Sequence, residues 1–452
     1  MLTSEQRAQR HILPLVQCPP VEKFRALIAC CAPSFASDSS SSSASVSAST
    51  ASAAAAAPPP SVSAEATLAL LTSMADWSAE LFLVHDRAAA AHALYEDVLS
   101  AVRAQQARAV SPDAEQEEWD AVSPAGEEPG GPAPADSLGE LSVRLQSTYP
   151  FTLISRVGAE LGELTRICAP EHPDASWTVL DPGTEGDKIA TYYRREAEGG
   201  THSFLVSGEV QAPMLNLVAM LREASLLYKW LPAVTESTQL SSLDNSRYRM
   251  LLRVIVQAIW PVADREAMLL AYGDIVDGGD NGDEGQVAIY FRSVDEREVF
   301  PKAGPDSQDV TVPPVKDGCV RVDVKVGGFT FKPLSATTTR VRALFNLDPK
   351  LFLIPHWFLN IMSKSFCATI VQLMRDKAPR LFNGHTAYAQ AMEQQGRVYD
   401  EIKRRIAELH EQHGHQAMAA AANDNASADG AAGDAGTVGA AAGPGGAAPG
   451  GP

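Results

Sequence analysis

The sequence has little of three features that point to common protein classes. Its 37 lysines and arginines are outnumbered by 55 acidic residues, and the formal net charge of −18 argues against a nucleic-acid binder with a basic face. Its six cysteines are scattered and form no Cys-x-x-Cys pair, so neither a disulfide framework nor a zinc ribbon is indicated. No apolar run reaches the roughly 18 residues of a membrane span, and the first residues lack the apolar stretch of a signal peptide. We expect a cytoplasmic protein that contacts membranes only peripherally.

The negative charge is concentrated in three segments. Residues 111–140 hold nine acidic and no basic side chains, residues 277–284 hold four acidic ones, and the tail after His415 holds three more. The rest of the chain is therefore close to neutral. Most of the net negative charge therefore belongs to the linker, one hairpin and the tail, and little of it belongs to a folded core.

Composition divides the 452 residues into six segments. Two of them are too poor in large apolar residues to offset the entropy of ordering, and we predict that they are disordered. The predicted segments are a mostly disordered, low-complexity region (1–64), a helical region (65–110), an acidic linker (111–136), a globular region (138–382), a C-terminal helix (383–415) and a disordered Ala/Gly/Pro tail (416–452).

The helical region carries apolar side chains spaced alternately four and three residues apart, from Leu70 to Val102. This is the a/d register of a coiled coil. Two interpretations are open: a helix that forms a homo-oligomer or binds a helical partner through this seam, and a helix or helical hairpin packed on its own domain. Ala88 and Ala91 narrow the seam at its middle and favour the second interpretation.

The globular region combines short alternating segments with one strongly apolar segment. Tyr248, Met250, Leu252 and Val254 alternate with arginines and other residues, a pattern typical of an antiparallel sheet with one solvent-exposed face. Residues 357–376 are apolar around most of a predicted helix and are expected to cover the other face. We therefore predict an α+β fold in which a curved antiparallel sheet wraps around a long C-terminal helix.

Several motifs in this region occur in the order in which a known family has them. They are YYRR at 192–195, FLVSGEV at 204–210, YKWLP at 228–232, WPVADRE at 260–266, PP at 313–314, GCVR at 318–321, GGFTFKPL at 327–334 and IPHWFLN at 354–360. Together they resemble the StAR-related lipid-transfer (START) domain, a helix-grip fold, over residues 177–382. The resemblance implies a soluble protein that encloses one hydrophobic ligand, such as a sterol or a phospholipid, in a cavity gated by the C-terminal helix. It does not cover residues 1–135 or 383–452.

The predicted cavity needs apolar walls and one or two polar groups that fix a head group. Among the polar candidates, Arg265 and Arg321 suit a charge-assisted contact to a head group, with a structural ion pair as the alternative. Asn360 would need a partner if it is buried. The residues predicted to line the cavity are Tyr248, Met250, Leu252, Val254, Arg265, Met268, Tyr272, Arg321, Val324, Trp357, Asn360, Ile361 and Phe366.

Other chemistries have weaker support. The acidic hairpin at 277–284 lacks two ligands of a calcium loop, and no nucleophile motif or phosphate-cradling glycine loop is present. We predict no metal, no cofactor and no enzymatic activity, since no acid–base pair is evident for a cyclase or hydrolase on this scaffold.

The expected partners are a lipid and, transiently, a membrane surface. The alternative function is a regulatory or adaptor protein in which a START-like domain senses a ligand and the helical region recruits a partner.

Overall fold

The structure is a computed structural model of the chain. It describes residues 64–109, 134–169, 174–183, 189–196, 201–242, 248–258, 262–276, 285–298, 311–348 and 368–432. The low-complexity region, most of the acidic linker, the hairpin loop at 277–284 and the segment 349–367 lie outside the described residues, as does most of the tail.

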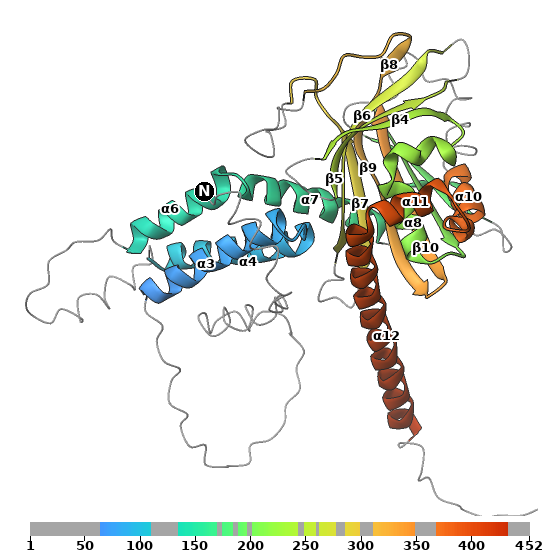
Figure 1. Cartoon of the computed structure of the whole chain (residues 1–452). Helices are drawn as coiled ribbons and strands as arrows, with labels where there is room; N and C mark the ends of the chain where they lie inside the picture. The colour runs from blue at the N-terminus through green and yellow to red at the C-terminus, as the bar shows by residue number, and fades with distance from the viewer. Residues whose placement is uncertain are drawn as a thin grey trace, which may run out of the picture.

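A single large sheet forms the centre of the molecule (Figure 1). Its strand order is β1-β2-β3-β10-β9-β7-β6-β5-β4, every neighbouring pair is antiparallel, and β8 pairs with β6 in parallel. The strands are β1 (Thr178–Asp181), β2 (Ala190–Arg195), β3 (His202–Val210), β4 (Val234–Ser242), β5 (Arg249–Val256), β6 (Asp264–Val276), β7 (Gln286–Ser293), β8 (Cys319–Arg321), β9 (Asp323–Ser335) and β10 (Thr338–Asp348).

The predicted helical region is a hairpin. Helices α3 (Ala64–Leu83) and α4 (Ala88–Ala109) are joined by a short turn, in which Asp86 has a positive φ of 51°. Aspartate tolerates this left-handed backbone conformation better than most residues. Helices α6 (Pro134–Ser147) and α7 (Phe151–Cys168) pack on the hairpin, so seam residues such as Met74, Tyr95 and Val98 are buried within the chain itself.

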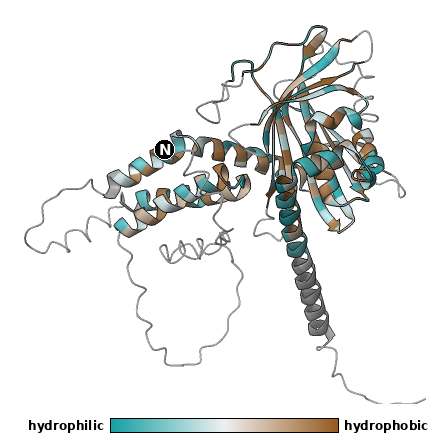
Figure 2. Cartoon of the chain, in the orientation of Figure 1, coloured by the Kyte–Doolittle hydropathy of each residue, from teal (hydrophilic) through white to brown (hydrophobic). Residues whose placement is uncertain are grey.

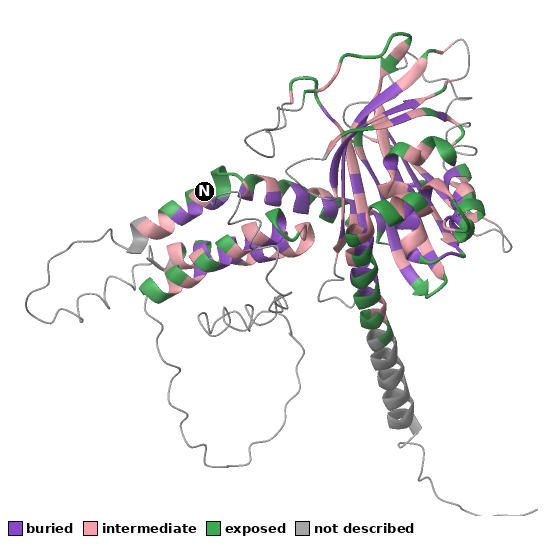
Figure 3. Cartoon of the chain, in the orientation of Figure 1, coloured by how far each residue is buried: buried purple, intermediate pink, exposed green. Residues whose placement is uncertain are grey.

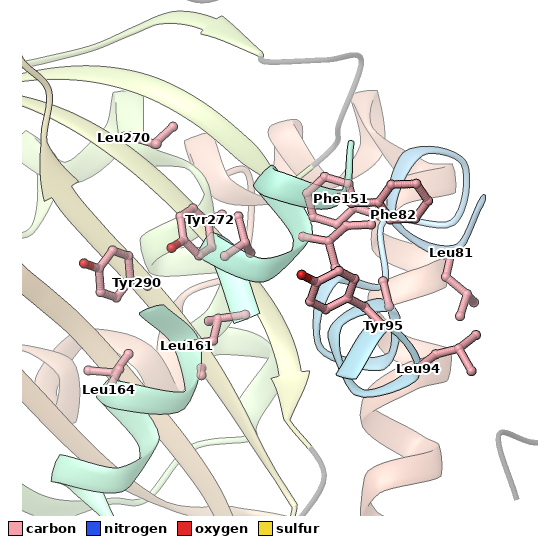
Figure 4. Packing of buried hydrophobic residues seen from close by; sticks show 14 of the residues in the cluster. Leu81, Phe82, Leu94, Tyr95, Phe151, Leu161, Leu164, Leu270, Tyr272 and Tyr290 are labelled. Atoms are coloured by element: carbon pink, nitrogen blue, oxygen red, sulfur yellow. The ribbon is translucent and has the colours of Figure 1, made fainter. Parts of the chain in front are cut away.

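One face of the sheet carries α7, and we call it the α7 face. Leu161 and Leu164 of α7 pack against Leu270 and Tyr272 of β6 and Tyr290 of β7 (Figure 4). The same hydrophobic cluster continues into the α3–α4 hairpin, where Phe82, Leu94 and Tyr95 are buried. The helical hairpin and this face of the sheet therefore share one core.

The opposite face carries the remaining helices, and we call it the α8 face. They are α8 (Met214–Arg222), the 3-10 helix η1 (Ala224–Lys229), α10 (Ala368–Lys377), the 3-10 helix η4 (Ala378–Arg380), α11 (Ala387–Gln394) and α12 (Gly396–Ala432). A second cluster joins Leu217 of α8, Val371 of α10 and Ile402 of α12 to Phe329 and Phe331 of β9. Helix α10 is the described part of the predicted helix over 357–376.

Helix α12 continues to Ala432, past the predicted end at residue 415. Alanine has the highest helix propensity of any residue, and the four consecutive alanines at 419–422 favour a helix here. Figure 1 shows α12 projecting away from the sheet beyond its packed first turns.

The prediction that one face of the sheet is exposed to solvent is wrong, because helices cover both faces (Figure 3). Two arginines of the α7 face contact protein groups. Arg342 is buried, and its Nη1 donates to the carbonyl oxygens of Cys168 and Ala169 at the end of α7, where helix carbonyls lack intrahelical partners. Arg249 lies over the Phe82 ring at 4.5 Å from its centroid.

The Gly-Gly motif of β9 allows close packing on both faces. A Cβ at Gly327 would lie 2.1 Å from the Phe291 ring, and a Cβ at Gly328 would lie 2.5 Å from Leu164 of α7 and 2.6 Å from the Ile289 carbonyl oxygen. No side chain fits either position without movement of its neighbours.

Candidate ligand-binding cavity

A cavity of about 90 Å³ lies on the α8 face between β5, β6, β7 and the helices α8 and α12. Its walls are mostly aliphatic. The ribbon in Figure 2 shows many hydrophobic residues, in brown, along the strands of the sheet. The lining residues are Val218, Leu221, Arg222, Tyr248, Met250, Leu252, Ala271, Tyr272, Gly273, Asp274, Ile275, Val287, Ile289, Ile402, Arg405 and Ile406.

The size of this cavity limits what it holds in the observed conformation. Its volume is about 90 Å³. Small-molecule pockets typically measure about 300–1,000 Å³. A lipid-sized ligand therefore requires the cavity to widen.

The predicted residues of β5 face this cavity. Tyr248, Met250 and Leu252 line it, and Val254 points to the same face from the next even position, although it is not among the lining residues. Directly opposed residues of an antiparallel pair share a face. Met250 opposes Ala271, so the odd-numbered residues of β6 accompany these even-numbered residues of β5.

Register places two predicted residues of β6 on the α7 face. Met268 opposes Arg253 and is fully buried in the cluster that contains α7. Tyr272 opposes Arg249, and its hydroxyl donates to Glu160 of α7, although the residue also borders the cavity. The sequence of β6 alone does not show whether its odd-numbered or its even-numbered residues face the cavity, because both sides of the strand are apolar.

The two predicted arginines lie away from this cavity. Arg265 at the start of β6 is partly exposed and donates to the carbonyl oxygen of Ala263. Arg321 of β8 pairs with Glu266 at 2.6 Å and with Glu296 at 2.9 Å. Glu266 is fully buried and also accepts a 2.6 Å hydrogen bond from the backbone N–H of Lys316. For Arg321 this geometry matches the alternative of a structural ion pair.

The remaining predicted residues do not reach the described cavity. Val324 is buried in β9, and its N–H donates to the hydroxyl of Ser293 at 2.8 Å. Trp357, Asn360, Ile361 and Phe366 lie outside the described residues.

A buried ion pair at the cavity wall was missed by the sequence prediction. The Arg405 guanidinium of α12 donates to the Asp274 carboxylate of β6, and these side chains are 7% and 1% exposed. Burial alone lowers the pKa of Arg405, but the Asp274 charge and hydrogen bond outweigh it and hold the pKa above its ordinary value. The other Asp274 oxygen accepts a 2.7 Å hydrogen bond from the N–H of Ala89, in the first turn of α4.

A second polar network closes the α8 end of the cavity. Arg222, a lining residue, pairs with Glu223 at 2.6 Å. Glu223 also accepts hydrogen bonds from Tyr399 Oη at 2.8 Å and from the Gln395 amide at 3.1 Å. Burial, and then the Glu223 charge, raises the pKa of Tyr399. These contacts attach the start of α12 to α8.

No described helix is long and apolar enough to cross a membrane. Within the described part of the chain, no three His, Cys, Asp or Glu side chains are grouped so that they could hold a metal ion.

No protein-family model and no curated protein matches the sequence. Similar solved structures include human StAR-related lipid transfer protein 5, with 16% identity over 52% of this chain and 99% of that chain and a TM-score of 0.40. Human STARD10 matches with 15% identity over 52% of this chain and 81% of its own, with a TM-score of 0.38. A fragment of the STAR-related lipid transfer protein from Xanthomonas axonopodis matches with 20% identity, coverages of 44% and 97%, and a TM-score of 0.32.

Identities this low give no information about the ligand, and the fold assignment rests on the strand order, the registers and the sequence motifs. One antiparallel sheet carries helices on the α8 face, and four of the motifs fall on its strands: YYRR on β2, FLVSGEV on β3, GCVR at β8 and GGFTFKPL on β9. The IPHWFLN motif lies outside the described residues. The chain therefore contains a START-like helix-grip domain of the α+β class, as its motifs indicate.

Proposed function

We propose that this protein binds one hydrophobic, lipid-like molecule on the α8 face of its sheet and carries it without covalent chemistry. The observation that supports this most is the cavity, whose wall combines many aliphatic side chains with a few buried polar groups. Sites of this composition bind apolar molecules by burial and orient them by the polar groups.

Helix α12 is the proposed gate. It reaches the cavity with Ile402, Arg405 and Ile406, and the volume of the cavity in the observed conformation is below the usual range of small-molecule pockets. Outward movement of α12 joins the cavity to the space that the helix occupies. Gating by a covering element of this kind is common where a ligand is sealed from water. Contact with a membrane surface during loading is part of the same proposal.

The adaptor alternative has less support. It depended on an apolar seam in residues 65–110 that was free to bind a partner helix. The described seam residues are buried against α6 and α7 of the same chain.

The proposal is tested by lipid extraction. The full chain is incubated with liposomes that contain phospholipid, sterol, diacylglycerol and fatty alcohol, re-isolated, and examined by native mass spectrometry. We expect about one lipid per chain, with one class preferred. Absence of bound lipid across all four classes would contradict the proposal.

A cavity-filling variant tests the location. Ala271→Leu adds side-chain volume on the cavity wall, and Ala267→Leu is its matched control, because Ala267 lies on the same strand and face but does not line the cavity. We expect Ala271→Leu to lose most lipid uptake and Ala267→Leu to retain it. Equal uptake by the two variants would place the ligand elsewhere.

A further inference from the structure

Arg405 lines the cavity, and one of its donor atoms has no hydrogen-bond partner in the part of the chain that the structure describes. Among the described residues, Arg405 Nε is buried and makes no hydrogen bond, while the terminal guanidinium nitrogen donates to Asp274. A buried donor without a partner costs about 1–3 kcal/mol, so such a group usually has a partner in the functional state.

The charge of the wall restricts the chemistry of that partner. Arg405 and Asp274 form a pair that is neutral as a whole, and both side chains are more than nine-tenths buried. An anionic head group beside this pair adds an uncompensated negative charge next to the Asp274 carboxylate in an apolar setting, which is strongly unfavourable. A neutral oxygen accepts the hydrogen bond without that cost.

We infer that Arg405 is the specificity-determining contact of the cavity and donates from Nε to a neutral oxygen, a hydroxyl or carbonyl, on an otherwise apolar ligand. This inference rests on the proposed function and adds the ligand class to it. It also gives α12, which lies beyond the segment with START-like motifs, a direct role in choosing the ligand. Alcohols and esters with long chains fit this contact, alkanes lack the acceptor, and carboxylates carry the disfavoured charge.

The test compares probes that share one hydrocarbon chain: hexadecanol, methyl palmitate, hexadecane and palmitate. Each is delivered to the full chain from phosphatidylcholine liposomes, and bound probe is counted by native mass spectrometry. We expect hexadecanol and methyl palmitate to bind about tenfold more tightly than hexadecane, as a hydrogen bond to a charged donor predicts. Palmitate should bind more weakly than hexadecanol.

Variants of the ion pair make the assignment specific. Arg405→Lys keeps a positive charge for Asp274 but removes the Nε donor, so the preference for hexadecanol over hexadecane should disappear. Asp274→Asn retains an acceptor for the Ala89 N–H but leaves Arg405 uncompensated, so the preference should shift to palmitate. Arg404→Gln is the matched control, because Arg404 is about half exposed and pairs with Glu401 and Glu408 along α12.

Each outcome has a distinct meaning. Equal binding of hexadecane and hexadecanol by the native protein overturns the inference and leaves the proposed function intact. Tightest binding of palmitate by the native protein also overturns it. Retention of the hexadecanol preference in Arg405→Lys shows that another group holds the oxygen. If none of the four probes binds but the liposome-extraction assay finds another bound lipid, the inference is overturned and the proposed function stands. If that assay also finds no lipid, the proposed function itself fails.

Discussion

At the scale of single residues, two buried carboxylates, Glu266 and Asp274, connect the elements of this domain. The arginines predicted to contact a ligand, Arg265 and Arg321, lie away from the cavity. The Glu266 carboxylate accepts hydrogen bonds from Arg321 and from the backbone N–H of Lys316. The Asp274 carboxylate joins β6 to α12 and to the first turn of α4. The sequence motif contains Arg265 and Glu266 side by side. It does not show which of the two is buried, because that depends on which face of β6 each residue occupies.

Removing the partner of Glu266 should destabilise the protein. Arg321→Gln leaves a fully buried carboxylate without its ion pair, which costs about 3–5 kcal/mol. The free energy of unfolding, measured with urea, checks this value. The control is Arg297→Gln at an exposed position, which should change stability by less than about 0.5 kcal/mol. A loss of that small size for Arg321→Gln would show that the ion pair is not buried in solution.

The residues that line the cavity were only partly predictable. Alternation in β5 correctly separates its even from its odd positions, and Tyr248, Met250 and Leu252 do line the cavity. In β6 both parities are apolar, and only the pairing of Met250 with Ala271 shows that odd positions face the cavity. Ile402 and Ile406 lie four residues apart, a spacing that places both on one side of a helix, but nothing in the nearby sequence indicates which strands they contact.

At the scale of elements, the helical hairpin shows what a heptad pattern leaves undetermined. The spacing predicts an apolar stripe, and the stripe is buried. Whether a second chain or the same chain buries it depends on the turn at residues 84–87, which reverses the direction, and on α6 and α7, which supply the covering surface. Ala91, a small residue in the middle of the apolar stripe, is fully buried, so its small side chain allows the helices to pack closely at this point.

Two glycines of α7 provide a matched test of how the hairpin packs on that helix. A Cβ at Gly158 would lie 1.9 Å from the His92 ring of α4, while a Cβ at Gly162 would have no neighbour within 4 Å. Gly158→Ala should therefore lower the free energy of unfolding by roughly 1–3 kcal/mol through overpacking. Gly162→Ala should raise it by about 0.5–1 kcal/mol, because alanine is the better helix former. Thermal and urea unfolding measure both, and equal effects would contradict the α4–α7 contact.

The same contact predicts a pH dependence. Burial lowers the pKa of His92 below its ordinary value of 6.5, with Glu96 opposing the shift. The unfolded chain then binds this proton more readily, so the His92 contribution is fully present above pH 6.5 and is lost as pH falls toward the lower folded pKa.

The measurement compares the unfolding free energy of the native protein with that of His92→Gln between about pH 8 and pH 5. The native protein should lose more stability on acidification, because the variant has no group to titrate at this position. Parallel curves for the two proteins would contradict the prediction.

At the scale of the whole molecule, the sheet and the helices of the α8 face enclose one cavity, and the N-terminal helices are linked to it through one side chain. The sheet supplies its floor, α8 and α12 supply its cover, and the Asp274 carboxylate joins that cover to the N-terminal helices. The motifs in the sequence were sufficient for the α+β class and the helix-grip architecture. They did not indicate α12 as part of the cavity, because the contacts of α12 come from residues beyond the segment in which the motifs lie.

The most direct test of the central claim is to locate a bound lipid in the chain. A hexadecanol probe with a photoactivatable diazirine in its chain is loaded from liposomes, irradiated, and mapped by mass spectrometry of peptides. We predict adducts on the cavity walls, at Met250 and Leu252 of β5 and at Ile402 and Ile406 of α12, that unlabelled hexadecanol competes away. Adducts confined to the exposed faces of α3 and α6, or labelling that unlabelled hexadecanol does not reduce, would contradict the account.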